Sequence, residues 1–264
     1  MGDAALEAAL MRTVVRVLQS LRGWILPALL LGLWEYTSHR DAAHAYAFVP
    51  LEQVLAALSE RLSDGDLLHN LEGSLLRASL GLLSGVVFGI GVGALMATST
   101  IALTLINPIY QSIRQVPLLG LTPLLGLWMG NGETAKVFII ALASFYPMVL
   151  NTYEGLRNVD TRYREVGYVY GFRRFQLFRR VLLPASLPSL FTGLQQAVPM
   201  AWIAAVGGEL LFNVGAGLGN LMMQAETGAR MDVIIVCTAS ITVLGIAMSY
   251  LASLLSAHAL RWRQ

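Results

Sequence analysis

The stretch that decides the fold is SLGLLSGVVFGIGVGALMA, residues 79–97. It lies within an uncharged run of 36 residues, 78–113, between Arg77 and Arg114. A helix that crosses a bilayer needs about 20 mostly apolar residues. Glycines recur in this stretch at every fourth position and fall on one helix face (Gly81, Gly85, Gly89, Gly93). We therefore predict a membrane-spanning helix over 75–97 whose glycine face lets another helix approach closely.

The composition of the whole chain agrees with a membrane protein. Of its 264 residues, 56% are hydrophobic and 13% are charged, against about 45–50% and about 25% in soluble domains. These values exclude an ordinary soluble globule, a disordered chain and a nucleic-acid binder built on a basic face. The single cysteine, Cys237, excludes an intrachain disulfide and a cysteine-based metal site. We interpret it as a small buried apolar residue.

Uncharged segments long enough to cross a bilayer recur along the chain, and we predict an all-α polytopic membrane protein with six transmembrane helices. The predicted spans are 20–37, 75–97, 101–119, 134–153, 188–211 and 233–256. Pro117, Gly120 and Pro123 interrupt the region 115–132. There we expect a short broken or re-entrant segment over 121–130 instead of a seventh span.

The N-terminal residues 1–21 are predicted to form a cytoplasmic amphipathic arm, ahead of a transmembrane domain over 22–260 and a cytoplasmic tail over 261–264. A cleaved signal peptide is the alternative, because arginines precede the apolar run and residues 43–45 resemble a cleavage site. The apolar core ends near Trp34, well before that site, so we favour an uncleaved first span.

The distribution of charge predicts the orientation in the membrane. Three places hold 12 of the 18 basic residues (Arg12, Arg16, Arg22, Arg157, Arg162, Arg164, Arg173, Arg174, Arg179, Arg180, Arg261, Arg263). Six spans put all three on one side, which the positive-inside rule makes the cytoplasm. The loop 38–72 on the other side holds six acidic residues and two arginines. We therefore expect both termini to be cytoplasmic.

Two ionisable residues lie deep within the predicted spans, Arg114 in the third and Glu209 in the fifth. Charges at such depth are costly and usually face a partner or a water-filled cavity. Their similar depths allow them to pair, which would set helix register, or to line a gate or an anion-sensing wall. Arg77 and Glu72 are expected to be shallower and to reach the interface.

The segment 154–184, EGLRNVDTRYREVGYVYGFRRFQLFRRVLLP, is unusually polar for a connection between two spans. Asp160 can cap a first short helix, and Gly171 can end it before a second, arginine-rich helix. Glu165, Val166 and Tyr170 are expected on one face of the first helix, with Val169 between them. The combination predicts a docking element for a cytoplasmic partner.

Within this segment, Glu165-Val166-Gly167-x3-Gly171-x9-Val181-x-Leu183-Pro184 resembles the coupling-loop signature of ABC importer permeases, Glu-Ala-Ala-x3-Gly-x9-Ile-x-Leu-Pro. The spacing matches throughout. The departures are Val166 and Gly167 for the two alanines and Val181 for isoleucine. The resemblance implies that the residues coupling to the ATPase are Glu165, Val166, Gly167, Tyr170, Gly171, Leu183 and Pro184.

The resemblance extends over roughly residues 20–260, and further strings resemble the sulfonate, taurine and nitrate branch. They are Arg114-Gln-Val-Pro117, Leu127-Trp128-Met-Gly130-x-Gly132-Glu133, Gly193-Leu-x6-Ala201-Trp202 and Gly215-x-Gly217-Leu-Gly219-x-Leu-Met. Pro117 and Trp202 join Arg114 and Glu209 as pathway or gate candidates. The last string could suggest a dinucleotide-binding loop, but it lacks a preceding strand, and we predict a tight extracytoplasmic loop instead.

The family implies a type I ABC importer transmembrane domain, in which a five-helix core follows one additional N-terminal helix. It implies a homodimer in the bacterial inner membrane, with two cytoplasmic ABC ATPase subunits and an extracytoplasmic solute-binding protein. The expected cargo is a small oxyanion, an alkanesulfonate first, then taurine or nitrate. An uncharged heterocycle such as a vitamin precursor is the alternative cargo.

The chain has no phosphate loop of the form GxxxxGK[ST]. We therefore expect a non-catalytic subunit without a cofactor of its own, with ATP and magnesium bound by the partner ATPase. A secondary transporter or channel is the alternative class, but it would need ion-coupling residues or an internal repeat, and we find neither clearly. A membrane enzyme is a third class, and the four scattered histidines do not favour it.

Overall fold

The structure is a computed structural model that describes residues 23, 25–40, 48–212 and 214–263. Within these ranges the regular secondary structure is helical, and there is no strand. The predicted arm over 1–21 lies outside the described residues, and residues 25–38 form the N-terminal helix. The predicted all-helical fold is confirmed.

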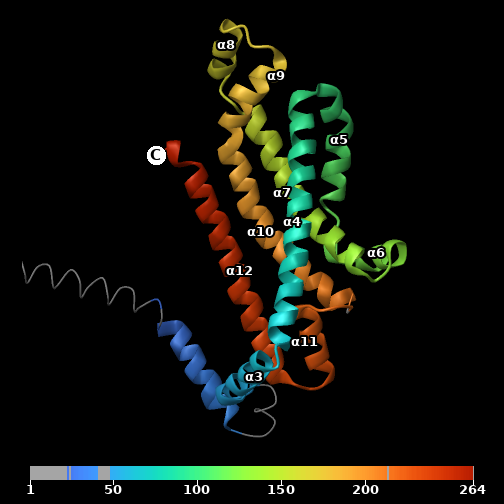
Figure 1. Cartoon of the computed structure of the whole chain (residues 1–264), viewed down its shortest axis with the longest axis vertical. Helices are drawn as coiled ribbons and strands as arrows, with labels where there is room; N and C mark the ends of the chain where they lie inside the picture. Colours follow the sequence, from blue (N-terminus) through green and yellow to red (C-terminus); the bar gives the residue numbers. More distant parts are fainter. Residues whose placement is uncertain (1–22, 24, 41–47, 213, 264) are drawn as a thin grey trace, which may run out of the picture.

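Long helices run nearly the length of the molecule (Figure 1). In chain order the α-helices are α3 (Leu51–Ser63), α4 (Asp66–Thr98), α5 (Thr100–Ile113), α6 (Thr122–Met129), α7 (Glu133–Arg157), α8 (Thr161–Val169), α9 (Arg174–Leu177), α10 (Leu183–Phe212), α11 (Leu218–Thr227) and α12 (Met231–Ala259). Short 3-10 turns lie at Leu118–Leu121 and Arg261–Arg263, and a π-helical turn spans Phe178–Leu182.

Among the described residues, three helices are long and apolar enough to cross a membrane: α4, α7 and α12. The predicted fifth span lies within the 30-residue helix α10. The third predicted span is shorter than expected, because α5 ends at Ile113. Its 14 residues extend about 21 Å, less than the hydrocarbon core of about 30 Å. The short broken segment predicted over 121–130 is present as α6.

Helix α7 packs between α4 and α10 and forms the centre of the fold. The glycine face of α4 lies against α7 in a matching four-residue register: Gly81 meets Ile140, Gly85 meets Ser144, Gly89 meets Met148 and Gly93 meets Thr152. A methyl group on Gly89 would lie 2.6 Å from Met148 Cβ, and one on Gly93 would lie 2.7 Å from Thr152 Cβ. Close backbone approach therefore requires these glycines, as predicted.

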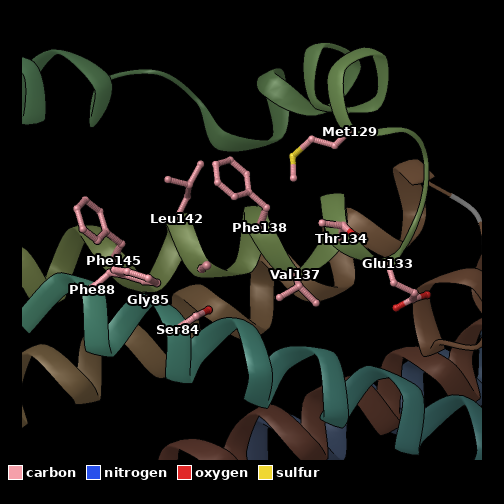
Figure 2. Close-up of a pocket in the computed structure, with 11 residues that line it drawn as sticks. Ser84, Gly85, Phe88, Met129, Glu133, Thr134, Val137, Phe138, Leu142 and Phe145 are labelled. Atoms are coloured by element: carbon pink, nitrogen blue, oxygen red, sulfur yellow. The ribbon is translucent and has the colours of Figure 1, made fainter.

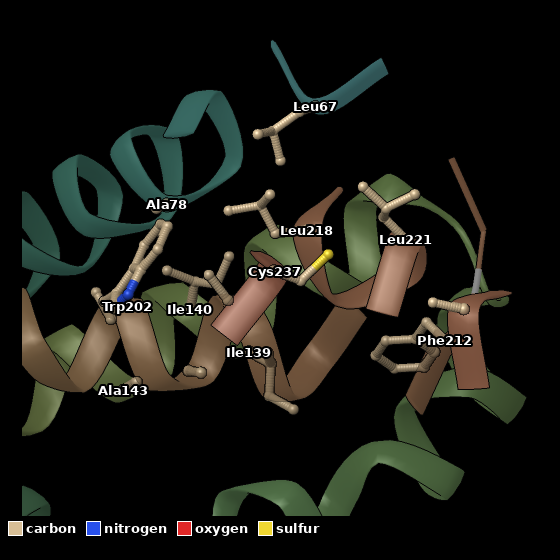
Figure 3. Close-up of a cluster of buried hydrophobic side chains, with 14 of the residues drawn as sticks. Leu67, Ala78, Ile139, Ile140, Ala143, Trp202, Phe212, Leu218, Leu221 and Cys237 are labelled. Atoms are coloured by element: carbon tan, nitrogen blue, oxygen red, sulfur yellow. The ribbon is translucent and has the colours of Figure 1, made fainter. Parts of the chain in front are cut away.

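A buried apolar cluster joins α4, α7, α10, α11 and α12 toward the α3 end of the molecule (Figure 3). Cys237 is fully buried in it, as predicted. Trp202 also lies in it, and its indole Nε1 donates to the Ile241 carbonyl at 3.0 Å. Gly245 leaves room for that ring, since a methyl group there would lie 2.9 Å from Trp202 Cδ1.

The two ends of the molecule differ in charge. Helices α8 and α9 and the C-terminus lie at one end, and α3 and α11 lie at the other (Figure 1). The first end carries the arginines of the segment 157–180, and the second carries the acidic residues of α3 and of the start of α4. This separation agrees with the charge bias from which the orientation was predicted.

Candidate functional site

The segment between α7 and α10 projects beyond the ends of the long helices (Figure 1). Asp160 caps α8, and its carboxylate accepts a hydrogen bond from the backbone N–H of Arg162 at 2.9 Å. Arg164 reaches back to the end of α7, where its Nη2 donates to the carbonyl oxygens of Leu156 at 2.9 Å and Arg157 at 3.2 Å. These carbonyls have no partner within their own helix, so Arg164 ties α8 firmly to α7.

Gly171 ends α8 in a tight turn, as predicted. Its φ is +70°, and its N–H donates to the Tyr168 carbonyl at 2.9 Å. The next N–H, of Phe172, donates to the Gly167 carbonyl at 3.0 Å. Together these bonds form a Schellman motif, which requires a left-handed residue at the position of Gly171. The rings of Tyr170 and Phe172 stack across the turn with centroids 6.1 Å apart.

Gly167 is the one buried residue of α8, and it faces the returning chain. A methyl group there would overlap Leu177 Cδ1 and lie 3.6 Å from Phe172 and Val181. The glycine therefore lets α8 pack directly on α9 and on the turn before α10. Pro184 lies in the first turn of α10 and has no N–H to donate to the Arg180 carbonyl. The chain before it widens into the π-helical turn, in which the Leu183 N–H donates to the Phe178 carbonyl.

The opposite face of α8 is largely exposed. Val169 is 87% exposed, and Val166 and Tyr170 are also largely exposed. Glu165 lies beside them, exposed and with no hydrogen-bond or ion-pair partner among the residues that the structure describes. An exposed apolar face with a free carboxylate, on a rigidly held helix, is the chemistry of a docking surface.

A second group of functional candidates lies at the other end, around Glu209. This side chain is 1% exposed and forms an ion pair with Arg77, which is also buried. The pairing suggested for Arg114 and Glu209 is therefore wrong, and the side chain of Arg77 is buried in this ion pair instead of reaching the surface of the molecule. Ser74 Oγ lies 2.8 and 2.9 Å from the two carboxylate oxygens of Glu209. Arg77 Nε also donates to Glu133 Oε2 at 2.6 Å.

The same cluster holds the glycine-rich loop between α10 and α11. The N–H of Gly217 donates to Asn70 Oδ1 at 2.7 Å, that of Leu218 to Ser74 Oγ at 2.9 Å, and that of Gly219 to Glu209 Oε2 at 2.9 Å. The buried ammonium of Lys136 binds the Val214 carbonyl. The loop is tight, as predicted, because its backbone is bonded to side chains of α4, α7 and α10.

The four pathway candidates occupy two environments. Glu209 and Trp202 are buried in the interior. Arg114 and Pro117 lie on the exposed break between α5 and α6, where the Arg114 guanidinium carbon is 5.7 Å from the centre of the Tyr110 ring. The structure brings Arg114 and Pro117 together but not with the other two.

The family of binding-protein-dependent transport system inner membrane components matches residues 85–261. The chain belongs to this family. The permease is 30% identical to the putative aliphatic sulfonates transport permease protein SsuC of Bacillus subtilis, over 92% of its own length and 88% of that protein.

Two other relatives are named for the transport of different molecules. The formylaminopyrimidine transport permease protein ThiX of Halalkalibacterium halodurans is 31% identical over 80% of the permease and 84% of that protein. The nitrate import permease protein NrtB of Leptolyngbya laminosa is 32% identical over 66% of the permease and 62% of that protein. The permease is thus similar to proteins named for several small molecules.

The solved structures support the fold. An inward-facing structure of the MetNI methionine ABC transporter matches with a TM-score of 0.60 at 20% identity, over 75% of the permease and 96% of that chain. The permease therefore has the fold of a type I ABC importer transmembrane domain, as the coupling-loop resemblance implied.

A hollow of about 580 Å³ lies between α4, α6 and α7 of the permease. Figure 2 shows Phe138 and Met129 approaching each other across it, with Glu133 at one end. Its other lining is mainly apolar, including Phe88, Leu142 and Phe145. Such a lining suits a hydrocarbon chain or an apolar side chain and offers little to a small anion.

The sequence reasoning missed the partners of Glu209, although one signal pointed to them. Asn70, Ser74, Arg77 and Gly81 follow one another at helical spacing, on the face that continues into the glycines of α4. Since that glycine face was already predicted to pack inside the bundle, the polar residues on its extension had to be buried and paired.

Proposed function

We propose that the permease works as a homodimer with two cytoplasmic ATPase subunits and an extracytoplasmic solute-binding protein. The observation that carries this proposal is the exposed face of α8, which is held to α7 by Arg164 and to α9 by the contact at Gly167. A force applied to α8 by closing ATPase subunits would move the attached long helices as rigid bodies. Such movement would switch the pathway between outward and inward opening.

Each coupling residue has a defined part in this proposal. Glu165 provides a charged contact to the ATPase, and Val166 and Tyr170 provide apolar contacts beside it. Gly167 and Gly171 allow α8 to pack closely on the chain that follows it, and Leu183 and Pro184 begin α10. ATP and magnesium would bind to the ATPase, so this chain would carry no cofactor.

The orientation proposed is that the α8 end is cytoplasmic, together with both termini. The arginines of the segment 157–180 and of the tail support it, because basic residues remain on the cytoplasmic side. The acidic α3 end would then face the extracytoplasmic binding protein. The bacterial inner membrane is the location that the family description supports.

A Glu165→Ala substitution is expected to uncouple transport without unfolding the permease. Loss of one central charged contact weakens an interface by about 1.4 kcal/mol, which is about tenfold in affinity. We therefore expect about tenfold less ATP-driven uptake in proteoliposomes at limiting ATPase, with unchanged insertion. Glu154→Ala, an exposed acidic substitution on α7, is the matched control. Normal uptake by Glu165→Ala would remove Glu165 from the coupling role.

The proposed cargo is a small oxyanion, with an alkanesulfonate as the first candidate, supported by the similarity to SsuC and NrtB. The test measures ATP hydrolysis in proteoliposomes that contain the permease, its ATPase and its binding protein. Stimulation by binding protein loaded with an alkanesulfonate supports both the importer and the cargo.

The similarity to ThiX favours a formylaminopyrimidine as the second candidate. Stimulation only by a heterocycle of that kind would keep the mechanism and replace the cargo. Absence of any ATPase association would favour a secondary transporter or channel.

A further inference from the structure

Helix α5 has three chemically distinct faces. One face packs into the bundle through Leu103, Ile106 and Tyr110. A second face is apolar and exposed, with a side chain at every fourth residue (Ile101, Leu105, Ile109, Ile113). The third face is polar, and its residues also follow one another at helical spacing (Thr100, Thr104, Asn107, Gln111, Gln115). We call this third set the polar stripe, and its members are exposed apart from Asn107, which is half-buried.

The polar stripe reaches the middle of the membrane-spanning region. Tyr110 donates its hydroxyl to the carbonyl of Tyr146 at 2.9 Å, and Tyr146 lies near the middle of α7. In Figure 1, α5 runs beside the upper half of α4 toward the centre of the molecule. The last turn of α5 therefore lies near the middle of the molecule along its long axis. Gln111, Arg114 and Gln115 therefore lie far from either end of the long helices.

Arg114 extends this face at the end of α5. It caps the C-terminus of the helix, and its guanidinium lies over the Tyr110 ring. No carboxylate of the described residues forms an ion pair with it. Its charge is therefore exposed and is not neutralised by an ion pair within the described part of the chain.

Such a surface does not fit hydrocarbon. Arginine at the centre of a bilayer is costly by any scale. Gln111 Nε2 donates to Asn107 Oδ1 at 3.5 Å, but the remaining polar atoms of these two amides and the amide of Gln115 would lose their hydrogen bonds with water in an apolar medium. The exposed apolar face of the same helix, Ile101 to Ile113, fits lipid well. The two faces therefore have different neighbours: lipid on one, and water on the other.

We propose that the polar stripe of α5 lines the water-filled translocation pathway and that Arg114, at its inner end, attracts and passes a small oxyanion. The inference rests on the proposed function and identifies the residues that the cargo meets. The guanidinium offers up to five N–H donors to oxyanion oxygens, and the amides of Gln111 and Gln115 can donate to the same group. A single positive charge at mid-height also repels cations.

The first test is cysteine accessibility in the complete transporter in proteoliposomes. Replacing the single cysteine of this sequence, as Cys237→Ala, makes each introduced cysteine the only one in the sequence, and labelling is measured on the permease band. Thr104→Cys, Asn107→Cys and Gln111→Cys report on the polar stripe. Leu105→Cys and Ile109→Cys, on the lipid-facing side of the same turns, are the matched controls. The probe is a charged, membrane-impermeant methanethiosulfonate.

We expect the stripe positions to react at least tenfold faster than the two controls. Equal rates on both faces would overturn the inference. Disulfide formation between two copies at the stripe positions, without labelling, would also overturn it, because the stripe would then be a dry interface. Association with the ATPase, measured in the same preparation, reports separately on the proposed function.

The second test concerns Arg114. Arg114→Gln is expected to lower oxyanion uptake about tenfold, and Arg114→Lys is expected to restore most of it by restoring the charge. A structural role of the planar guanidinium over Tyr110 would not be rescued by lysine in this way. Equal uptake by the wild type and Arg114→Gln would overturn the anion role.

Discussion

Replacing Glu209 by alanine is expected to lower the stability and the yield of folded permease more than a substitution of any exposed residue. The substitution leaves the buried cation of Arg77 with only the exposed Glu133 as its ion-pair partner, and the buried ammonium of Lys136 lies 3.9 Å from the same carboxylate. It also removes the acceptor for Ser74 and for the Gly219 N–H. Removing one member of a buried ion pair costs about 3–5 kcal/mol, a large part of the stability of a typical domain.

The melting temperature in detergent and the yield of inserted protein measure this effect. Glu165→Ala is the matched control, since it removes the same charged group from an exposed site, where the expected cost is about 0.5 kcal/mol or less. The paired variant Arg77→Met with Glu209→Leu should be less destabilised than Glu209→Ala alone, because it leaves no unpaired partner of the Arg77–Glu209 pair. If Glu209→Ala melts like Glu165→Ala, the cluster does not hold the fold together.

A Gly85→Leu substitution is expected to prevent α4 from packing on α7. Even a single methyl group at Gly85 would overlap Ser144 Oγ and the Ala141 carbonyl oxygen. The carbonyl belongs to the backbone of α7, so relief requires the whole helix to move. Overpacking of this kind costs about 1–3 kcal/mol even where side chains can yield, and here the main contact of the fold is affected. We expect little folded protein in the membrane.

Gly91 provides the control in the same helix. It is exposed, and a methyl group there would meet nothing within 4 Å. Gly91→Ala should be neutral or stabilising by up to about 1 kcal/mol, because alanine is the better helix former. Gly91→Leu should retain normal yield. Equal losses from Gly85→Leu and Gly91→Leu would show that helix propensity, and not close packing, explains the glycines.

Features that depend on neighbouring residues were predictable from the sequence. The glycine repeat of α4 indicated close packing because its period matches that of a helix. Gly171 was expected to end α8, and the left-handed conformation there explains why a glycine is present. The coupling-loop spacing was sufficient to indicate the family, because its residues lie close together in sequence, on α8, on the turn at Gly171 and on the first turn of α10.

Features that depend on distant residues were not predictable in the same way. The partners of Glu209 lie on α4 and are 132 residues away in the case of Arg77. Matching depth alone suggested Arg114, which lies on a different face of the bundle. The third span was predicted over 101–119, but α5 ends at Ile113, where the uncharged run also ends. Pro117 disfavours helical backbone at Val116, so the helix does not continue to the predicted end of the span.

The unbroken length of α10 has a consequence for how the two ends of the permease communicate. Pro188 and Pro199 lie within the helix without ending it, so one continuous helix connects the turn at Leu183 to Glu209. Its 30 residues extend about 45 Å, so a tilt of about 5° at one end displaces the other end by about 4 Å. Because Glu209 accepts a hydrogen bond from the Gly219 N–H, the loop between α10 and α11 must move with this end of α10. Under the proposed function, a movement of the small helix α8 would therefore be transmitted along α10 to the loop 214–219.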